Sequence, residues 1–295
     1  MTTPAIDAPD ADLLARTQRN LLRFHGLSLR AGPGARREDW PDATALGSGL
    51  PTRSANTLFA VRPGPSLPDL LSRCRDFYRS TPSWRASAPE PWAPALEPLV
   101  RGAGLQFDTR VPRLVFRGGA NEPPVPSDLR VERVEHLAAL RDFCDAASRG
   151  FGIPRRYLLY AFSRGVPLTE SGRPALRLFV GYDRGRPVAT SAATTSDGVT
   201  GIFFVATAPS SRRRGFAQAL TAVALADGRG LGGEMAWLQS SAAGRRLYER
   251  MGFRPLCDDL EWFAPATAEG RIRSAIRELR IVAGPFRMRL PITGA

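Results

Sequence analysis

The chain has 295 residues, of which 43% are hydrophobic, so it is long and apolar enough for two domains of ordinary size. Its formal net charge is +13, and all 41 basic residues are arginine because no lysine occurs. Cys74, Cys144 and Cys257 are odd in number and far apart, which argues against a disulfide framework and a zinc site.

The sequence offers no sign of export or of a membrane anchor. No stretch approaches the ~20 apolar residues of a membrane helix. The first residues, Met1–Asp12, contain no apolar core of signal-peptide length. We therefore expect a protein of the reduced cytoplasm, with no membrane and no metal among its partners.

The strong positive charge raises nucleic acid as a partner. The arginines are scattered, however, and no basic block is longer than Arg212–Arg214. A chain without lysine but rich in alanine, glycine and proline is typical of a GC-rich bacterial genome. We therefore interpret the charge as a solvated basic surface, with nucleic-acid binding as the less favoured alternative.

The N-terminal part reads as a mixture of helices and strands. Apolar periodicity predicts a helix over residues 11–26, with His25 at its end in a capping role. Downstream, alternation and periodicity predict a strand, two helices and a last strand, over residues 56–61, 67–79, 96–104 and 111–116. Residues 118–127 carry Gly-Gly and three prolines, a composition typical of a linker.

After this linker the pattern becomes regular. A first strand is predicted to begin at Leu129, followed by helical segments over 134–147 and 156–162. Three strands are predicted next, over 176–182, 187–195 and 199–207, and Asp197-Gly198 is a strong hairpin signal. Residues 266–295 remain, and the sequence leaves open whether they pack, exchange into a homodimer or stay disordered.

The stretch from Gly201 to Phe253 carries the clearest functional signal. A buried strand ends at Ala208-Pro209, and a helix with apolar residues at three- and four-residue spacing starts near Phe216. The first turn of a helix presents unpaired N–H groups and a positive dipole end. Gly215 and Ala217 have almost no side chain to obstruct a ligand, and three arginines lie beside them. This pattern predicts an anion site.

The same stretch resembles a known family. The sequence Arg212-x-x-Gly215-x-Ala217 resembles the pyrophosphate loop [QR]-x-x-G-x-[GA] of the GNAT superfamily of acyl-CoA-dependent N-acyltransferases. Downstream, a strand over 235–239 and a helix over 241–251 lead into Leu247-Tyr248 and Gly252-Phe253, which resemble the second GNAT signature, A-x-x-L-Y-x-x-x-G-F. Two departures are mild: Gly244 replaces the usual alanine, and Ser241 stands where many members carry asparagine.

The resemblance implies a fold and a domain arrangement. The fold would be α/β (α+β), a mixed, mostly antiparallel sheet flanked by helices, over residues 128–265 with a last strand near 255–262. Residues 1–117 would form a smaller α+β domain, either a degenerate GNAT-like domain or an unrelated cap, and would supply no CoA site. Residues 118–127 would be the linker, and 266–295 an extension of unknown role.

The resemblance also implies an activity, the transfer of an acetyl group from acetyl-CoA to a primary amine. Tyr248 would be the general acid that protonates the departing thiolate. Backbone groups of the strand would pair with the pantetheine, and the loop would hold the pyrophosphate. The implied cofactor-binding residues are Val205, Ala206, Thr207, Arg212, Arg213, Arg214, Gly215, Phe216, Ala217 and Ser241.

The acceptor side is less determined. Many GNAT enzymes use a glutamate on the strand before the phosphate loop, but Gly201–Thr207 contains no acid. Asp258, Asp259 or Glu261 could line the acceptor pocket and attract a cationic amine, although we interpret them as solvated surface acids. Equally, water could carry the proton away. Aromatic candidates for the acceptor pocket wall are Phe151, Tyr157 and Tyr160. A non-catalytic acyl-CoA sensor or structural module is the alternative function, and the acceptor, a small molecule or a peptide amine, is not determined.

Overall fold

The computed structural model describes residues 8–30, 32–62, 69–81, 83–118, 128–164, 166, 169–170, 172–264, 275 and 281. The predicted linker at 118–127 and extension at 266–295 lie almost wholly outside these residues. The described strands form one sheet of eleven strands and a separate two-stranded hairpin. The α/β class and the mixed, mostly antiparallel sheet are confirmed.

The N-terminal half contains helices and strands, of which sequence periodicity identified only some. A long helix, α1 (Ala8–Arg30), comes first. It is followed by β1 (Arg36–Asp39), β2 (Ala43–Gly47), the 3₁₀ turn η1 (Arg53–Ala55), β3 (Asn56–Ala60), α2 (Leu70–Tyr78), β4 (Arg85–Pro89), η2 (Glu90–Leu96), α3 (Glu97–Gly102) and β5 (Gln106–Phe116).

The C-terminal half follows the predicted order closely. Its elements are β6 (Leu129–Arg133), α4 (Leu137–Phe151), α5 (Arg155–Ala161), the short pair β7 (Thr169–Glu170) and β8 (Arg173–Pro174), β9 (Arg177–Asp183), β10 (Arg186–Ser196), β11 (Val199–Thr207), η3 (Pro209–Ser211), α6 (Phe216–Gly230), β12 (Met235–Gln239), α7 (Arg245–Arg250) and β13 (Arg254–Phe263). The hairpin at Asp197-Gly198 is confirmed, with φ angles of 51° and 68° that a type I′ turn requires.

The two halves repeat one order of elements. In each, antiparallel strands lead into a strand that pairs in parallel with the next one across a helix: β3 with β4 across α2, and β11 with β12 across α6. A second helical segment and a last strand follow, β5 in the first half and β13 in the second. The N-terminal half therefore has the topology of the back half of the C-terminal one.

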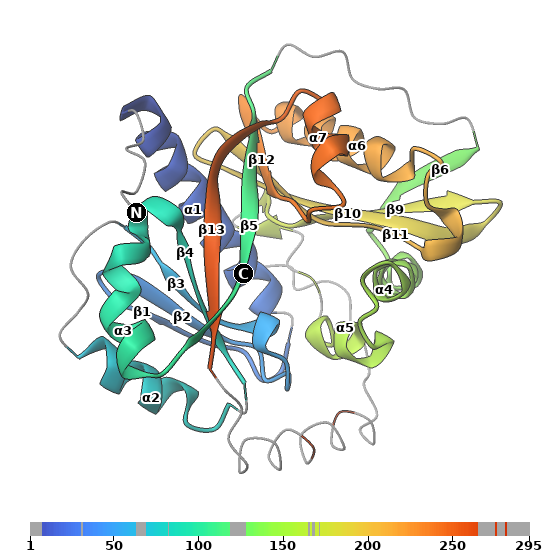
Figure 1. Ribbon diagram of the computed structural model, residues 1–295. Coiled ribbons are helices and arrows are strands. Elements are labelled where there is room, and N and C mark those ends of the chain that lie inside the picture. The colour runs from blue at the N-terminus through green and yellow to red at the C-terminus, as the bar shows by residue number, and fades with distance from the viewer. Residues whose placement is uncertain are drawn as a thin grey trace.

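The last strands of the two halves are exchanged. The sheet order is β1-β2-β3-β4-β13-β5-β12-β11-β10-β9-β6, so β13 inserts between β4 and β5. The strand β5 in turn pairs with β12 of the other half. Figure 1 shows β5 and β13 side by side at the centre of the molecule, between the N-terminal and C-terminal strands. The sheet therefore does not divide at the predicted boundary between the halves.

Helix α1 ties the halves together from one face of the sheet. Its apolar side packs with residues of both halves, including Phe59 of β3 and Val199 and Trp237 of β11 and β12. This helix runs to Arg30, four residues beyond the predicted end at Gly26. The prediction that His25 caps the helix end is therefore wrong. His25 lies inside the helix, with its ring against Phe24 and Phe59.

Several N-terminal strands escaped the sequence analysis. The strands β1, β2 and β4 are short, and β1 (Arg-Arg-Glu-Asp) is exposed throughout, so neither alternation nor an apolar run marks it. Strand β5 is longer than predicted and begins at Gln106. Its exposed residues 106–110 form no apolar run, but they belong to the strand because they pair with β13. The helix predicted over 241–251 is shorter, with α7 spanning only Arg245–Arg250.

Candidate functional site

The central feature of the site is a strand edge left without a partner. Strands β11 and β12 pair in parallel from Val199 opposite Met235 to Gly201 opposite Trp237. Strand β11 continues to Thr207, but within the described residues its pairing with β12 ends at Gly201. The two strands therefore separate, and the backbone of β11 beyond Gly201 can accept an extended ligand as an added strand.

The free part of β11 contains a β-bulge. Thr190 of β10 pairs with Ala206 and Ala192 with Phe203, so Phe204 and Val205 together face the single residue Ser191. Phe204 has φ of +51°, which is rare for a bulky residue. The Thr190 hydroxyl donates a 2.7 Å hydrogen bond to the Phe204 carbonyl and fixes this conformation. The bulge removes one residue of β11 from the hydrogen-bond ladder with β10 and changes the direction of the β11 backbone at that residue.

The predicted anion site forms directly after this strand. The chain turns through η3, and Arg213 and Gly215 adopt positive φ angles of 67° and 80°. Gly215 is the N-cap of α6 and offers no side chain to the first turn. The N–H groups of Phe216 and Ala217 have no acceptor within their own helix. The loop thus presents backbone donors and the positive end of a 15-residue helix.

The three loop arginines have different roles. Arg212 donates to the carbonyls of Thr207 and Gly150 and so holds the loop against the end of α4. Arg214 forms ion pairs with Asp128 and Asp183, and its hydrogen bonds lower the pKa of Asp183. Arg213 is exposed and, among the described residues, forms no ion pair. Arg213 is thus the arginine whose charge is most available to an anion.

Val205, Ala206 and Thr207 end the strand beside α4. The Thr207 side-chain oxygen is buried and has no hydrogen-bond partner in the described structure. A buried hydroxyl without a partner is costly and is a group that a bound ligand can satisfy. Sequence alone did not distinguish this hydroxyl from the other polar atoms of the strand.

Gly150 makes the close approach of α4 to this strand possible. A Cβ at Gly150 would lie 2.6 Å from the Ala206 Cβ and 3.1 Å from the Thr207 nitrogen. Neither atom belongs to a flexible side chain, so β11 or α4 must move. We expect Gly150→Ala to lower the free energy of unfolding by about 1–3 kcal/mol, measured by urea denaturation.

The matched control for this prediction is Gly230→Ala at the end of α6. A Cβ there meets nothing within 4 Å. We expect this variant to be as stable as the wild type or more stable by about 0.5–1 kcal/mol, since alanine restricts the unfolded chain. Equal stability of the two variants would contradict the close packing at Gly150.

Tyr248 lies on α7, the helix that follows β12. Its ring is 7% exposed and packs in the cluster that contains Leu238, Met251 and Phe253. The hydroxyl forms no hydrogen bond with any described residue, yet it is not enclosed. Burial raises the pKa of Tyr248 to about 12, so the phenol keeps its proton at all ordinary pH values.

Ser241 and Gly244 shape the start of the same helix. The Ser241 hydroxyl accepts a 3.2 Å hydrogen bond from the Gly244 N–H. A Cβ at Gly244 would lie 3.1 Å from the Tyr248 ring, so an alanine there would press on Cε2 of the tyrosine. The glycine in place of the usual alanine therefore gives the Tyr248 ring more room.

The interpretation of all three C-terminal acids as solvated is wrong for two of them. Asp259 is 1% exposed and Glu261 is 5% exposed. Asp259 pairs with Arg113, and Glu261 pairs with Arg85. Burial raises the pKa of Glu261, and Arg85 opposes that rise. Asp258 alone is partly exposed, 3.7 Å from Arg110.

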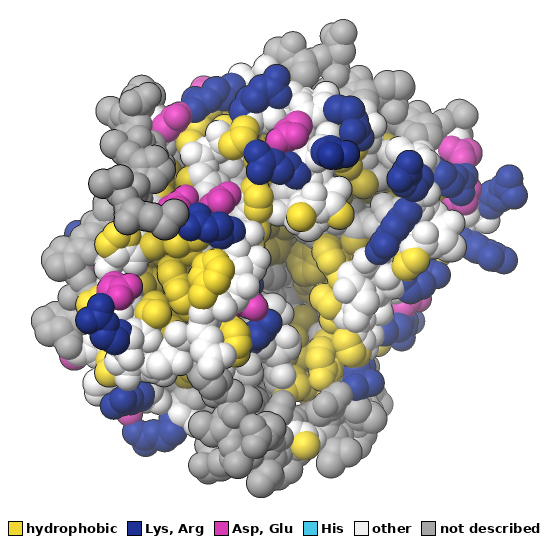
Figure 2. Space-filling view, viewed as in Figure 1, with side chains coloured by type: hydrophobic (Ala, Val, Ile, Leu, Met, Phe, Trp, Pro, Cys, Tyr) yellow, Lys and Arg dark blue, Asp and Glu magenta, His cyan; other side chains and the backbone are white. Residues whose placement is uncertain are grey.

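The aromatic wall predicted for the acceptor pocket is only partly assembled. Phe151 is 45% exposed, and its ring lies 6.0 Å from Phe204 at the bulge. Tyr160 instead lies against the N-terminal half, where its hydroxyl is within 2.8 Å of a Cβ built at Gly34 or Gly49. Tyr157 lies under the Arg156 guanidinium. Figure 2 shows a hollow between the two halves with hydrophobic side chains along its walls.

Among the described residues, no group of three or more His, Cys, Asp or Glu side chains is placed to hold a metal ion. None of the helices formed by those residues combines the length and apolarity needed to cross a bilayer. A cavity of about 390 Å³ lies elsewhere, beside α1 at Arg19, Arg23 and Asp197.

Comparison with known proteins agrees with this geometry. The family model described as "Acetyltransferase (GNAT) family" matches residues 139–253. No curated protein matches the chain in sequence.

Solved structures match over both halves. A GCN5-related N-acetyltransferase from Kribbella flavida is 21% identical, with a TM-score of 0.65, over 86% of this chain and 96% of that one. A GCN5-related N-acetyltransferase from Sphaerobacter thermophilus is 17% identical, with a TM-score of 0.54, over 90% and 96%. A tandem GNAT protein from the clavulanic acid biosynthesis pathway is 13% identical, with a TM-score of 0.51, over 86% and 97%.

These structures share the fold of this chain at low sequence identity. The family match covers the bulged strand, the anion loop and Tyr248. Residues 139–253, in the C-terminal half of the chain, therefore match the GNAT acetyltransferase family.

Proposed function

We propose that the protein transfers an acetyl group from acetyl-CoA to a primary amine, by direct attack of the amine on the thioester. The observation that carries this proposal is the continuity of the free β11 edge with the N-terminus of α6. An extended pantetheine needs backbone partners, and the pyrophosphate at its end needs N–H donors without side chains in the way. The free strand edge and the helix N-terminus follow one another along the chain, over residues 202–217.

The proposed cofactor contacts follow from this arrangement. Backbone groups of Val205 and Thr207 would pair with the pantetheine amides, and the Thr207 hydroxyl would gain the partner it lacks. The N–H groups from Arg213 to Ala217 would hold the pyrophosphate, with Arg213 adding charge at the rim. Arg212 and Arg214 would instead keep the loop in shape, because they already bind carbonyls and carboxylates. Ser241 would position α7.

The chemistry requires a neutral amine, a donor for the oxyanion and an acid for the sulfur. The amine nitrogen bonds to the carbonyl carbon, and the negative charge that develops on oxygen would be met by a β11 N–H near the bulge. The carbon–sulfur bond then breaks. Tyr248 would give its proton to the thiolate, and its hydroxyl, which is bound to no described residue, supports this role.

The two buried acids of β13 are not free to take the amine proton. Asp259 and Glu261 are bound to buried or half-buried arginines. We infer that the proton leaves to water and that acceleration comes from proximity and orientation of the two substrates. The lack of a base also favours the second candidate, a sensor that binds acyl-CoA without turnover.

We also propose that residues 1–117 are a second, degenerate GNAT-like domain in the cytoplasmic enzyme. The repeated order of elements and the exchanged last strands support this, as does the similarity to a tandem GNAT structure. The N-terminal domain would stabilise β12 through β5 and bind no CoA.

The direct test is release of CoA thiol from acetyl-CoA in the presence of amines. A panel would contain aliphatic amines, aromatic amines and peptides with free N-termini, with acetyl-CoA binding followed by calorimetry. Micromolar binding with amine-dependent thiol release would support the transferase. Binding with no release for any amine would favour the sensor, and absence of binding would exclude both.

A further inference from the structure

A buried polar chain links α1 to the end of β12. The Arg113 guanidinium is fully buried and forms two hydrogen bonds with the Asp259 carboxylate, of 2.8 and 3.0 Å. It also donates to Thr17 and Gln18 of α1, and it lies 4.9 Å from the centre of the Trp237 ring. Every side of this guanidinium is thus held, and it fixes the Asp259 carboxylate in turn.

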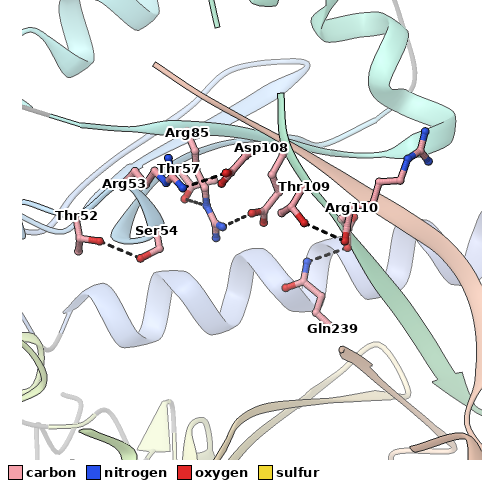
Figure 3. A network of polar contacts seen from close by, with 11 residues as sticks. Thr52, Arg53, Ser54, Thr57, Arg85, Asp108, Thr109, Arg110 and Gln239 are labelled. Atoms are coloured by element: carbon pink, nitrogen blue, oxygen red, sulfur yellow. Dashed lines mark hydrogen bonds and ion pairs between the residues drawn. The ribbon is translucent and has the colours of Figure 1, made fainter. Parts of the chain in front are cut away.

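Gln239 is the last link of this chain. Its Nε2 donates a 2.8 Å hydrogen bond to the Asp259 Oδ2. Since a carboxylate paired with arginine only accepts, the amide must turn its nitrogen toward Asp259 and its oxygen away. Figure 3 shows Gln239 with its amide nitrogen joined to the network and its oxygen directed out of it. That oxygen accepts no hydrogen bond from any described residue, and it is not enclosed.

Neighbouring polar groups of the sheet are also engaged. Figure 3 shows separate polar contacts on the same sheet, between Arg85 and Thr57 and between Arg53 and Asp108. Arg85 binds both the Thr57 hydroxyl and Glu261, so the next carboxylate along β13 is also occupied. Within the described chain, the Gln239 oxygen is thus a hydrogen-bond acceptor that its neighbours leave free.

Gln239 itself lies beside the separated strands. Gln239 is the last residue of β12, two residues beyond Trp237, where pairing with β11 ends. Side chains alternate along a strand, so Gln239 shares the face of Trp237, while Leu238 packs with Tyr248 on the other face. A thioester held on the β11 edge would have the acid for its sulfur on one face and the Gln239 oxygen on the other.

We propose that Gln239 Oε1 binds an N–H of the acceptor amine and that Arg113 and Asp259 are positioning residues for it. This inference rests on the proposed function and adds to it. A primary amine has two N–H groups, so one can be held by Gln239 while the lone pair points at the carbonyl carbon. A neutral oxygen holds the amine without stabilising the ammonium form as a carboxylate would, which keeps it nucleophilic.

The test compares Gln239→Met with the wild type. Methionine has a similar length and shape but cannot orient an N–H through a carbonyl oxygen. We expect KM for the amine to rise roughly tenfold, the effect of one lost hydrogen bond, with kcat changed less. The dissociation constant of acetyl-CoA and the melting temperature should stay within about twofold and a few degrees of the wild type. Gln106→Met, an exposed glutamine at the start of β5, is the control and should match the wild type.

A second variant covers the case in which methionine disturbs the fold. Gln239→Asn keeps the amide but withdraws it by one methylene, so KM for the amine should rise again. Unchanged amine kinetics in a folded variant would overturn the inference. Weaker acetyl-CoA binding with an unchanged amine KM would also overturn it, by assigning Gln239 to the pantetheine. Absence of acetyl-CoA binding by the wild type would instead reject the proposed function itself.

Discussion

We expect Gly215→Glu to raise the dissociation constant of acetyl-CoA at least ~100-fold in a calorimetric titration. Gly215 is the N-cap of α6 with φ of +80°, a conformation in which a side chain is strained. A glutamate would also place a negative charge among the N–H groups proposed to receive the pyrophosphate. Loss of two charge-assisted hydrogen bonds, at about 1.5–3 kcal/mol each, accounts for a change of this size.

The control is the same substitution at the other end of the same helix. Gly230→Glu adds an equal charge at the last residue of α6, where a Cβ meets nothing within 4 Å. We expect it to bind acetyl-CoA like the wild type, and both variants should show a folded circular-dichroism spectrum. Wild-type affinity in the Gly215 variant would contradict the anion site, and equal loss in both variants would point to net charge rather than position.

We expect Tyr248→Phe to lower kcat about 100- to 1,000-fold while acetyl-CoA binds as in the wild type. General acid catalysis contributes about 10²–10⁴-fold, and the phenylalanine ring still fills the buried position against Phe253. The measurement is single-turnover acetylation of an amine found in the panel, with binding by calorimetry. A kcat within threefold of the wild type would remove Tyr248 from the reaction.

The pH profile adds an independent check on Tyr248. Burial raises its pKa to about 12, so the acid form persists as the pH rises. The wild-type rate should increase with pH as the amine loses its proton and should not fall again below about pH 11. Tyr78→Phe is the matched control, since Tyr78 is a buried tyrosine of the N-terminal half that should leave kcat unchanged.

The sequence indicated some parts of the site without the contacts that define their roles. The sequence identified Arg212–Arg214 as a basic group, but it could not assign Arg214 to ion pairs with Asp128 and Asp183, which lie 86 and 31 residues away. It also could not find Gln239, because no local pattern separates this glutamine from any other at a strand end. Its role depends on Asp259, Arg113 and α1 meeting in space.

The sequence by itself determined the unit from β11 to α7: a buried strand, a glycine loop, a helix and Tyr248. These signals act over a few residues, through hydrophobic period, glycine conformation and the helix terminus, so they can be read without the rest of the chain. Only the tertiary structure decided that β5 and β13 exchange places and that Asp259 and Glu261 are buried. The Arg113–Asp259 pair joins residues 146 apart, and strand pairing at such separations depends on the packing of the whole sheet.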